Sequence, residues 1–365
     1  MSDTTKPSGT TDGGPRPDAV EVLGPRREAL VPGTPLLEVD DLHVEFVTRD
    51  GIAKAVNGVS YSVSAGETLA VLGESGSGKS VTAQAIMGIL DMPPGRITAG
   101  RILFRGQDLL TMSSKARRAV RGRKIAMIFQ DALSSLNPVL SVGYQLGEMF
   151  RVHQGASRKE ARERSVELME RVRIPAARQR VNDFPHQFSG GMRQRIMIAM
   201  ALSMEPDLII ADEPTTALDV TVQAQVMDLL AELQAEFQMG LILITHDLGV
   251  VADVTDKIAV MYAGRIVETA PVHELYARPA HPYTRGLLTS IPRLDQKGQN
   301  LYAIQGLPPS LLRIPAGCAF NPRCDRVQDR CLVEPPPLVP VLDADGADLP
   351  GRRSACHFWK ETLHG

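Results

Sequence analysis

The arrangement of apolar and polar residues along the chain predicts two kinds of β-strand. Residues 36–46, LLEVDDLHVEF, alternate apolar and polar side chains as an edge strand does. Three other short segments are apolar almost throughout, namely TLAVL at 68–72, LIIAD at 208–212 and GLILIT at 240–245. Runs of this length are typical of strands buried on both faces of a parallel sheet. We therefore predict an α/β core with its functional residues at the carboxyl ends of those strands.

Residues 157–174, SRKEARERSVELMERVRI, have the periodicity of an amphipathic helix. Ser157 and Glu160 have the spacing of a capping box, which predicts that the helix begins there. One face carries the apolar residues Ala161, Leu168, Met169 and Val172. We interpret the many charged residues as the solvated face.

Composition divides the chain into three parts. Residues 1–34 are rich in Gly, Pro, Thr and charged residues, and we interpret them as a disordered tail. Pro and Gly become frequent again toward the other end, with EPPPLVPV at 334–341 as the extreme. We therefore predict a core domain at 35–290 and a small, loop-rich C-terminal extension at 291–365.

The overall composition excludes several classes of protein. The net charge of −2 gives no support for nucleic-acid binding, and 43% hydrophobic residues are enough for a large core. No apolar run approaches the roughly 18–20 residues that span a bilayer. The first twenty residues also lack the apolar segment of a signal peptide. We expect a soluble, cytosolic protein whose exposed thiols stay reduced.

A glycine-rich segment predicts a phosphate site. GESGSGKS at Gly73–Ser80 fits the pattern G-x-x-x-x-G-K-[ST], and it lies between a predicted strand and a helix-forming run. Backbone N–H groups in such a turn surround a phosphate, and the helix N-terminus adds partial positive charge. We expect Lys79 to reach the β- and γ-phosphates and the Ser80 hydroxyl to bind Mg²⁺.

The strand LIIAD ends in one acidic residue and is followed directly by another. Asp212 is expected to hold Mg²⁺ through water, and Glu213 is placed to polarise an attacking water as general base. An Asp-Glu pair at a strand end can also cap the next turn. The hydrolase interpretation therefore depends on the phosphate loop being present in the same chain.

The segment FSGGMRQR at 188–195 precedes another predicted helix. Its serine and glycines form a second possible anion-binding helix N-terminus, which we interpret as serving a nucleotide held by another subunit. The alternative is a serine N-cap followed by flexible glycines.

Together these motifs resemble, over residues 36–290, the ATP-binding subunit of an ABC transporter. The resemblance implies a P-loop NTPase core of ABC ATPase type, an antiparallel β subdomain and a helical signature subdomain at about 131–204. It implies ATP and Mg²⁺ as ligands, Glu213, His246 and Lys79 as catalytic residues, and Ser80, Gln130 and Asp212 at Mg²⁺. The nucleotide-contacting residues implied are Phe46, Gly73, Glu74, Ser75, Gly76, Ser77, Gly78, Lys79, Ser80, Val81, Gln130, Asp212, Ser189, Gly190, Gly191 and Asp219. One departure is Met192, where the family usually has Gln.

Longer sequence segments resemble those of a narrower group, the oligopeptide/dipeptide importer ATPases. Nickel importers share many of these segments. The segments are DALSSLNP, FPHQFSGGMRQR, EPTTALDVTVQAQ and HPYTRGLLTSIPRL. The SGGM form resembles the first of the two unlike ATPase subunits in these importers. The resemblance implies a different ATPase chain, two permease subunits and an extracytoplasmic peptide-binding protein as partners, at the cytoplasmic face of the membrane.

Four cysteines occur in the chain, and all of them lie in the C-terminal extension, at Cys318, Cys324, Cys331 and Cys356. Structural zinc usually has cysteine pairs two to four residues apart, and this spacing is wider. Four thiolates also suit an iron–sulfur cluster, and the importer family carries this extension. A [4Fe–4S] cluster, Zn²⁺ and free thiols remain as alternatives.

Two other functions compete with peptide import. A soluble ABC ATPase of translation or DNA repair usually has two ATPase domains or a long coiled coil, and neither is present. The basic run KARRAVRGRK at 115–124 has no aromatic residue to stack on bases, so we expect no nucleic-acid partner. A degenerate, non-hydrolysing subunit is the second competitor, and the intact Glu213 and His246 argue against it.

Overall fold

The computed structural model describes residues 30–131, 135–216, 218–290 and 304–364. The predicted disordered tail at 1–34 therefore lies almost entirely outside the described residues. Its last five residues are described, and there the Gly33 N–H donates to the Ala65 carbonyl at 2.9 Å.

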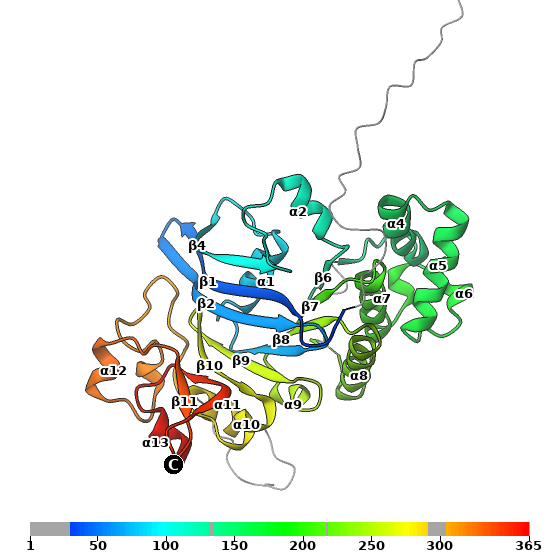
Figure 1. The fold of residues 1–365 in the computed structure, drawn as a ribbon. Helices are drawn as coiled ribbons and strands as arrows, with labels where there is room; N and C mark the ends of the chain where they lie inside the picture. Colours follow the sequence, from blue (N-terminus) through cyan, green and yellow to red (C-terminus); the bar gives the residue numbers. More distant parts are fainter. Residues whose placement is uncertain (1–29, 132–134, 217, 291–303, 365) are drawn as a thin grey trace, which may run out of the picture.

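The described chain forms two β-sheets (Figure 1). The smaller is antiparallel with the order β2-β1-β4-β5, and the larger has the order β11-β12-β10-β9-β3-β8-β7-β6. The strands of the smaller sheet are β1 (Pro35–Thr48), β2 (Gly51–Ser64), β4 (Gly95–Phe104) and β5 (Gln107–Asp108). Those of the larger are β3 (Thr68–Leu72), β6 (Ile125–Ile128), β7 (Leu208–Asp212), β8 (Gly240–Thr245), β9 (Lys257–Tyr262), β10 (Arg265–Pro271), β11 (Val339–Leu342) and β12 (Asp348–Ser354).

The three predicted buried strands are β3, β7 and β8, which lie in the parallel part of the larger sheet. Their residues face two separate cores in alternation. In β3, Leu69 and Val71 pack toward the smaller sheet and α1, whereas Ala70 and Leu72 pack toward the helices on the other face. Burial on both faces explains why these segments are apolar throughout, and the predicted α/β fold is confirmed.

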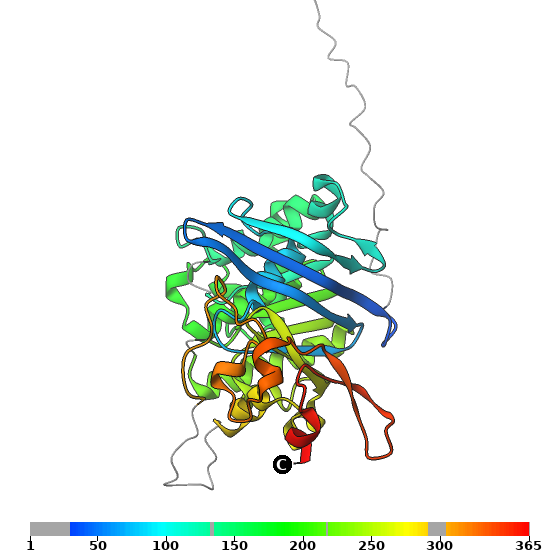
Figure 2. The same cartoon turned by 90° about the vertical axis from the view of Figure 1, so that its left-hand side faces the viewer.

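The prediction that residues 36–46 form an edge strand is wrong. They belong to β1, which pairs with β2 on one side and β4 on the other. The alternation arises because one face of this antiparallel sheet packs on the core while the other is solvated, and a central strand shows it as clearly as an edge. Figure 2 shows β1 and β2 lying as long strands across the core.

One set of helices is grouped on one side of the sheets, α8 (Val220–Phe237) lies next to that group, and the other helices are spread elsewhere (Figure 1). The grouped helices are α4 (Val142–Gln154), α5 (Arg158–Arg171), α6 (Ala177–Arg180) and α7 (Gly190–Leu202). The others are α1 (Lys79–Met87), α2 (Ser114–Val120), α9 (Leu248–Val251), α10 (Val272–Ala277), α11 (Pro282–Thr289), α12 (Asp329–Val333) and α13 (Trp359–His364), with 3₁₀ turns η1 (Pro185–Gln187) and η2 (Asn321–Arg323). The Ser157 side chain accepts from the Glu160 N–H at the start of α5, as the capping pattern predicts.

The C-terminal extension is continuous with the core sheet. Strand β12 pairs with β10, and β11 pairs with β12, so the parallel sheet gains an antiparallel border. In Figure 1 this part lies on the opposite side of the sheets from the α4–α7 group. The prediction of a loop-rich extension did not include this pairing, because β12 pairs with an edge that β10 offers from far away in sequence.

A buried carboxyl connects β10 to the segment before α11. Glu268 is fully buried and accepts hydrogen bonds from the N–H groups of Ala280 at 2.7 Å and His281 at 3.0 Å. Burial raises the pKa of Glu268 to about 7, although these hydrogen bonds and the charge of Arg352 favour the ionised form. The folded protein therefore holds a proton on Glu268 at pH values where the unfolded chain has lost it.

We predict that this carboxyl makes the protein less stable as the pH rises from about 4.5 to about 7. Glu268→Gln removes the titrating group. Between about pH 5.5 and pH 8, wild type should lose about 2 kcal/mol more unfolding free energy than the variant. Urea unfolding at the two pH values measures this, with the exposed Glu163→Gln as a control. Equal pH dependence in wild type and Glu268→Gln would contradict the prediction.

Candidate nucleotide and cysteine sites

The phosphate loop connects β3 to α1 and closes around Lys79. The Lys79 side chain is only 5% exposed, and its Nζ donates to the carbonyls of Gly73 at 2.7 Å and Glu74 at 3.0 Å. Burial lowers the pKa of Lys79, and the carboxylates of Glu213, Asp212 and Glu74 oppose that shift. The cation is thus held at the centre of the loop by backbone oxygens, facing acidic groups.

Two loop glycines are required by close backbone contacts. A Cβ on Gly73 would lie 2.2 Å from the Met261 carbonyl oxygen, and one on Gly78 would lie 2.3 Å from that of Ala55. Gly78 also has a φ of +103° where it caps α1. The loop can therefore approach β9 and β2 only because these positions have no side chain.

The carboxyl end of β7 brings oxygen ligands next to the loop. The Ser80 hydroxyl donates to the Asp212 carboxylate at 2.9 Å. Asp212 is 6% exposed, and burial raises its pKa while the Ser80 hydrogen bond opposes the rise. A hydroxyl and a partly desolvated carboxylate are the hard oxygen donors that suit Mg²⁺.

Three neighbouring strands bring polar residues together around Glu213. Its carboxylate accepts from the Gln130 side chain at 2.8 Å and the Thr216 hydroxyl at 2.9 Å, and it lies 3.3 Å from His246 Nδ1. Gln130 follows β6, Glu213 follows β7 and His246 follows β8, so the parallel register of the sheet assembles the group. The Glu213 backbone has a φ of +47°, which is unusual for a residue with a side chain.

The glycine-rich start of α7 lies against α8. Ser189 caps α7 by accepting from the Met192 N–H, and Asp219 caps α8 by accepting from the Val222 N–H. A Cβ on Gly191 would lie 2.4 Å from Val222, so the two helix starts are packed together. Phe46 lies on β1, half-buried against the core, and Val81 lies in the first turn of α1.

The remaining predicted residues lie in the phosphate loop and at the start of α7. Ser75 and Gly76 are exposed at its tip, and Ser77 is buried, with its carbonyl accepting from the Gly264 N–H. Gly190 lies in the first turn of α7, with Leu218 as its neighbour.

Three residues at the site were not predicted from the sequence. Thr216 bonds to Glu213, the Tyr283 hydroxyl accepts from the Glu74 N–H at 3.0 Å, and Arg323 pairs with the Glu74 carboxylate. Tyr283 belongs to the phrase HPYTRGLL, which marked a subfamily without suggesting any chemistry. The only sequence feature that could have drawn attention to Arg323 is its position directly before Cys324.

The four cysteines line one small cavity. Cys318, Cys324, Cys331 and Cys356 surround it together with apolar side chains such as Phe320 and polar ones such as Arg326. All four thiols are free, and burial raises the pKa of Cys324 to about 11 and of Cys356 to about 12. Within the described ranges, no group of three or more His, Cys, Asp or Glu side chains is close enough to hold a single metal ion. The structure thus brings the thiols around one space without forming a mononuclear site.

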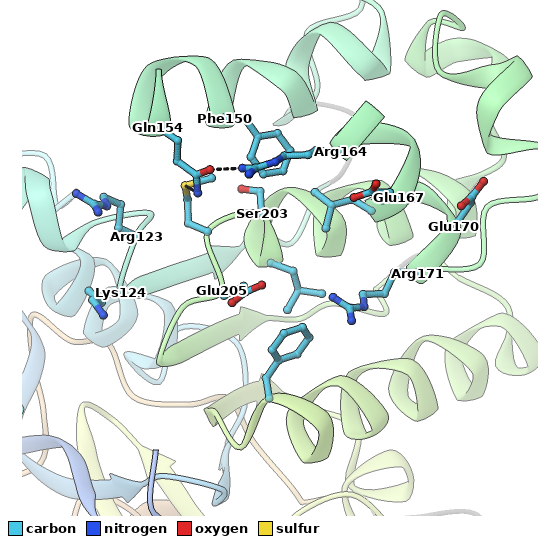
Figure 3. Close-up of a pocket in the computed structure, with 14 residues that line it drawn as sticks. Arg123, Lys124, Phe150, Gln154, Arg164, Glu167, Glu170, Arg171, Ser203 and Glu205 are labelled. Carbon is cyan, nitrogen blue, oxygen red and sulfur yellow. Dashed lines mark hydrogen bonds between the residues drawn. The ribbon is translucent and has the colours of Figure 1, made fainter. Parts of the chain in front are cut away.

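A large cavity lies away from these sites, between α5 and the start of β6 (Figure 3). Its volume is about 990 Å³. It is bordered by Lys124, before β6, whereas the nucleotide residue Gln130 follows the other end of that strand. Three of its cationic residues have carboxylate partners, since Lys124 pairs with Asp207, Arg164 with Glu160 and Arg171 with Glu236. This cavity belongs to neither the nucleotide site nor the cysteine site.

Comparison with known proteins identifies the class. A family model described as ABC transporter matches residues 56–216, and one described as oligopeptide/dipeptide transporter, C-terminal region, matches 267–331. A dimeric ATP-binding cassette solved in a post-hydrolysis state with ADP and Pi covers 65% of this chain and 99% of its own, with a TM-score of 0.59 and 26% identity. The fold and the motifs together define an ATP-hydrolysing subunit of the ATP-binding-cassette class.

Similarity to characterised sequences narrows the class. The oligopeptide transport ATP-binding protein OppD of Bacillus subtilis (strain 168) is 53% identical over 85% of this chain and 87% of its own length. The dipeptide transport ATP-binding protein DppD of Escherichia coli (strain K12) is 48% identical over 88% of this chain and 96% of its own. This chain belongs to the family of ABC transporter ATP-binding subunits for oligopeptides and dipeptides, which confirms the predicted resemblance. Among the described residues, no helix has the length and apolarity needed to cross a bilayer.

The close approach at Gly78 leads to a prediction. Gly78→Ala should weaken Mg-ATP binding at least about tenfold, because its Cβ would push the loop away from the Ala55 carbonyl. Gly76→Ala is the matched control, because a Cβ there has no neighbour within 4 Å and only the backbone conformation is strained. Calorimetric titration of both variants tests this. Equal affinities in the two variants would show that the contact does not shape the loop.

Proposed function

We propose that this chain hydrolyses ATP with Glu213 as general base and so drives peptide import through a membrane permease. The observation that carries the proposal is the position of the Glu213 carboxylate. This carboxylate is held by Gln130, Thr216 and His246. Glu213 directly follows Asp212, the last residue of β7, which accepts a hydrogen bond from Ser80 of α1. The names of the relatives support oligopeptides or dipeptides as the cargo.

Each residue has a distinct role in the proposed reaction. Lys79 leaves its carbonyl partners and neutralises the β- and γ-phosphates, while the loop N–H groups hold the remaining oxygens. Ser80, Asp212 and Gln130 would hold Mg²⁺, which would offset phosphate charge. Glu213 takes a proton from water, and His246 steadies the γ-phosphate.

We further propose a head-to-tail pair with a second, unlike ATPase subunit. The start of α7, with Ser189, packs on α8, and its free N–H groups are available to a nucleotide held by another chain. The SGGM phrase supports a partner of different sequence. Two permease subunits and an extracytoplasmic peptide-binding protein complete the assembly, and this subunit lies peripherally at the cytoplasmic face.

For the cysteines we propose a [4Fe–4S] cluster. Four thiols from separate segments surround one cavity, which suits a polynuclear group because iron and sulfide atoms occupy the space between the ligands. Zn²⁺ would require all four sulfurs at about 2.3 Å from one ion, and therefore much closer together. When bound, the cluster would cross-link the extension, whose own apolar core is small.

The role of Glu213 is tested by substitution. Glu213→Gln should keep Mg-ATP binding and lower kcat at least about 100-fold, because the amide cannot accept the proton of water. Phosphate release by the assembled transporter measures this, and Glu236→Gln on the exposed face of α8 is the control. Normal turnover by Glu213→Gln would refute the assignment.

The cluster is tested by metal analysis. Full-length protein purified without oxygen should be brown and contain about four iron atoms per chain. Cys331→Ser should lose both, whereas the neighbouring Arg330→Gln should retain them. Stoichiometric zinc without iron would exclude the cluster.

A further inference from the structure

An arginine from the cysteine segment contacts the phosphate loop directly. The guanidinium of Arg323 donates from Nη1 and Nη2 to the two carboxylate oxygens of Glu74, at 2.6 and 2.9 Å. Glu74 is the second residue of the phosphate loop and lies 249 positions away in sequence. A two-point pair of this kind fixes orientation as well as charge.

Arg323 is held firmly by its own surroundings. Its side chain is 4% exposed, and its guanidinium lies 5.8 Å from the centre of the Tyr262 ring and 6.0 Å from that of Phe320. Its Nε donates to the Gln305 carbonyl at 3.1 Å. The hydrogen bonds to Glu74 raise the pKa of Arg323, despite its burial. Arg323 therefore reaches the loop as a permanently charged, oriented group.

Glu74 is fixed from two sides. Tyr283 accepts the hydrogen bond from its backbone N–H, and Arg323 binds its side chain. The aromatic rings of Tyr283 and Phe320 are neighbours, with centres 5.3 Å apart, so the two contacts belong to one packed unit. The first half of the phosphate loop is thus positioned by residues of the C-terminal part of the chain.

The negative charge of the Glu74 carboxylate opposes the binding of a triphosphate at this site. Glu74 is a direct neighbour of Lys79, the residue that neutralises phosphate, because the Lys79 Nζ donates to the Glu74 backbone carbonyl at 3.0 Å. An unpaired carboxylate at this position would repel the nucleotide and compete for the lysine. The bidentate contact with Arg323 cancels that charge within the protein.

We propose that Arg323 is a positioning residue for the nucleotide site: it neutralises Glu74 and holds the first half of the phosphate loop in its phosphate-binding conformation. Affinity for ATP therefore depends on a contact made by the C-terminal extension. This inference rests on the proposed phosphate-binding role of the loop.

A double-mutant cycle between Arg323 and Glu74 tests the proposal. Binding of the β,γ-imido analogue of ATP with Mg²⁺ is measured by calorimetry on the full-length chain. Arg323→Gln should weaken binding about tenfold in the wild-type background, because it leaves the Glu74 charge unpaired. In the Glu74→Gln background the same substitution should cost less than about twofold. The loss should also shrink at high ionic strength.

Further variants separate this role from general damage. Arg323→Lys keeps the charge without the two-point geometry and should recover part of the affinity. Arg330→Gln removes an exposed pair in the same extension and is the control. Equal losses from Arg323→Gln in both backgrounds, or none in either, would overturn the proposal, as would Arg323→Lys binding as weakly as Arg323→Gln.

The phosphate-binding role itself is tested in parallel. Lys79→Ala should abolish analogue binding. If it does so while Arg323→Gln binds normally, only the inference about Arg323 fails. If Lys79→Ala binds normally, the proposed nucleotide site fails instead.

Discussion

The buried ammonium of Lys79 sets the conditions for the rest of the site. A cation with 5% exposure is costly unless its surroundings compensate for the lost water. Two backbone carbonyls do so directly, and three carboxylates add a favourable field. Because the loop must curl tightly to offer those carbonyls, glycine is required where it passes β2 and β9.

The parallel sheet supplies the second half of the site for geometric reasons. Adjacent parallel strands end at the same edge, so residues that follow β6, β7 and β8 become neighbours although they are far apart in sequence. Gln130, Glu213 and His246 meet in this way. The Glu213 carboxylate is therefore contacted by side chains that follow the strands on both sides of β7.

Much of the fold and of the nucleotide site was predictable from the sequence, for reasons that can be given residue by residue. The apolar runs of β3, β7 and β8 reflect burial on both faces, and the motif at Gly73–Ser80 is specific enough to predict its own conformation. The edge assignment of β1 failed because alternation reports which face is buried and says nothing about how many neighbours a strand has. Pairing of β12 with β10 and the contact of Arg323 with Glu74 join distant segments. No local pattern encodes such contacts.

The continuity of the C-terminal extension with the core sheet bears on how the chain is made. While the chain is being synthesised, β10 emerges well before β12, and its outer edge stays without a strand partner until residues 348–354 appear. Arg323 likewise leaves the ribosome long after the phosphate loop it contacts. An interrupted translation product would therefore combine an unpaired strand edge with an unneutralised Glu74.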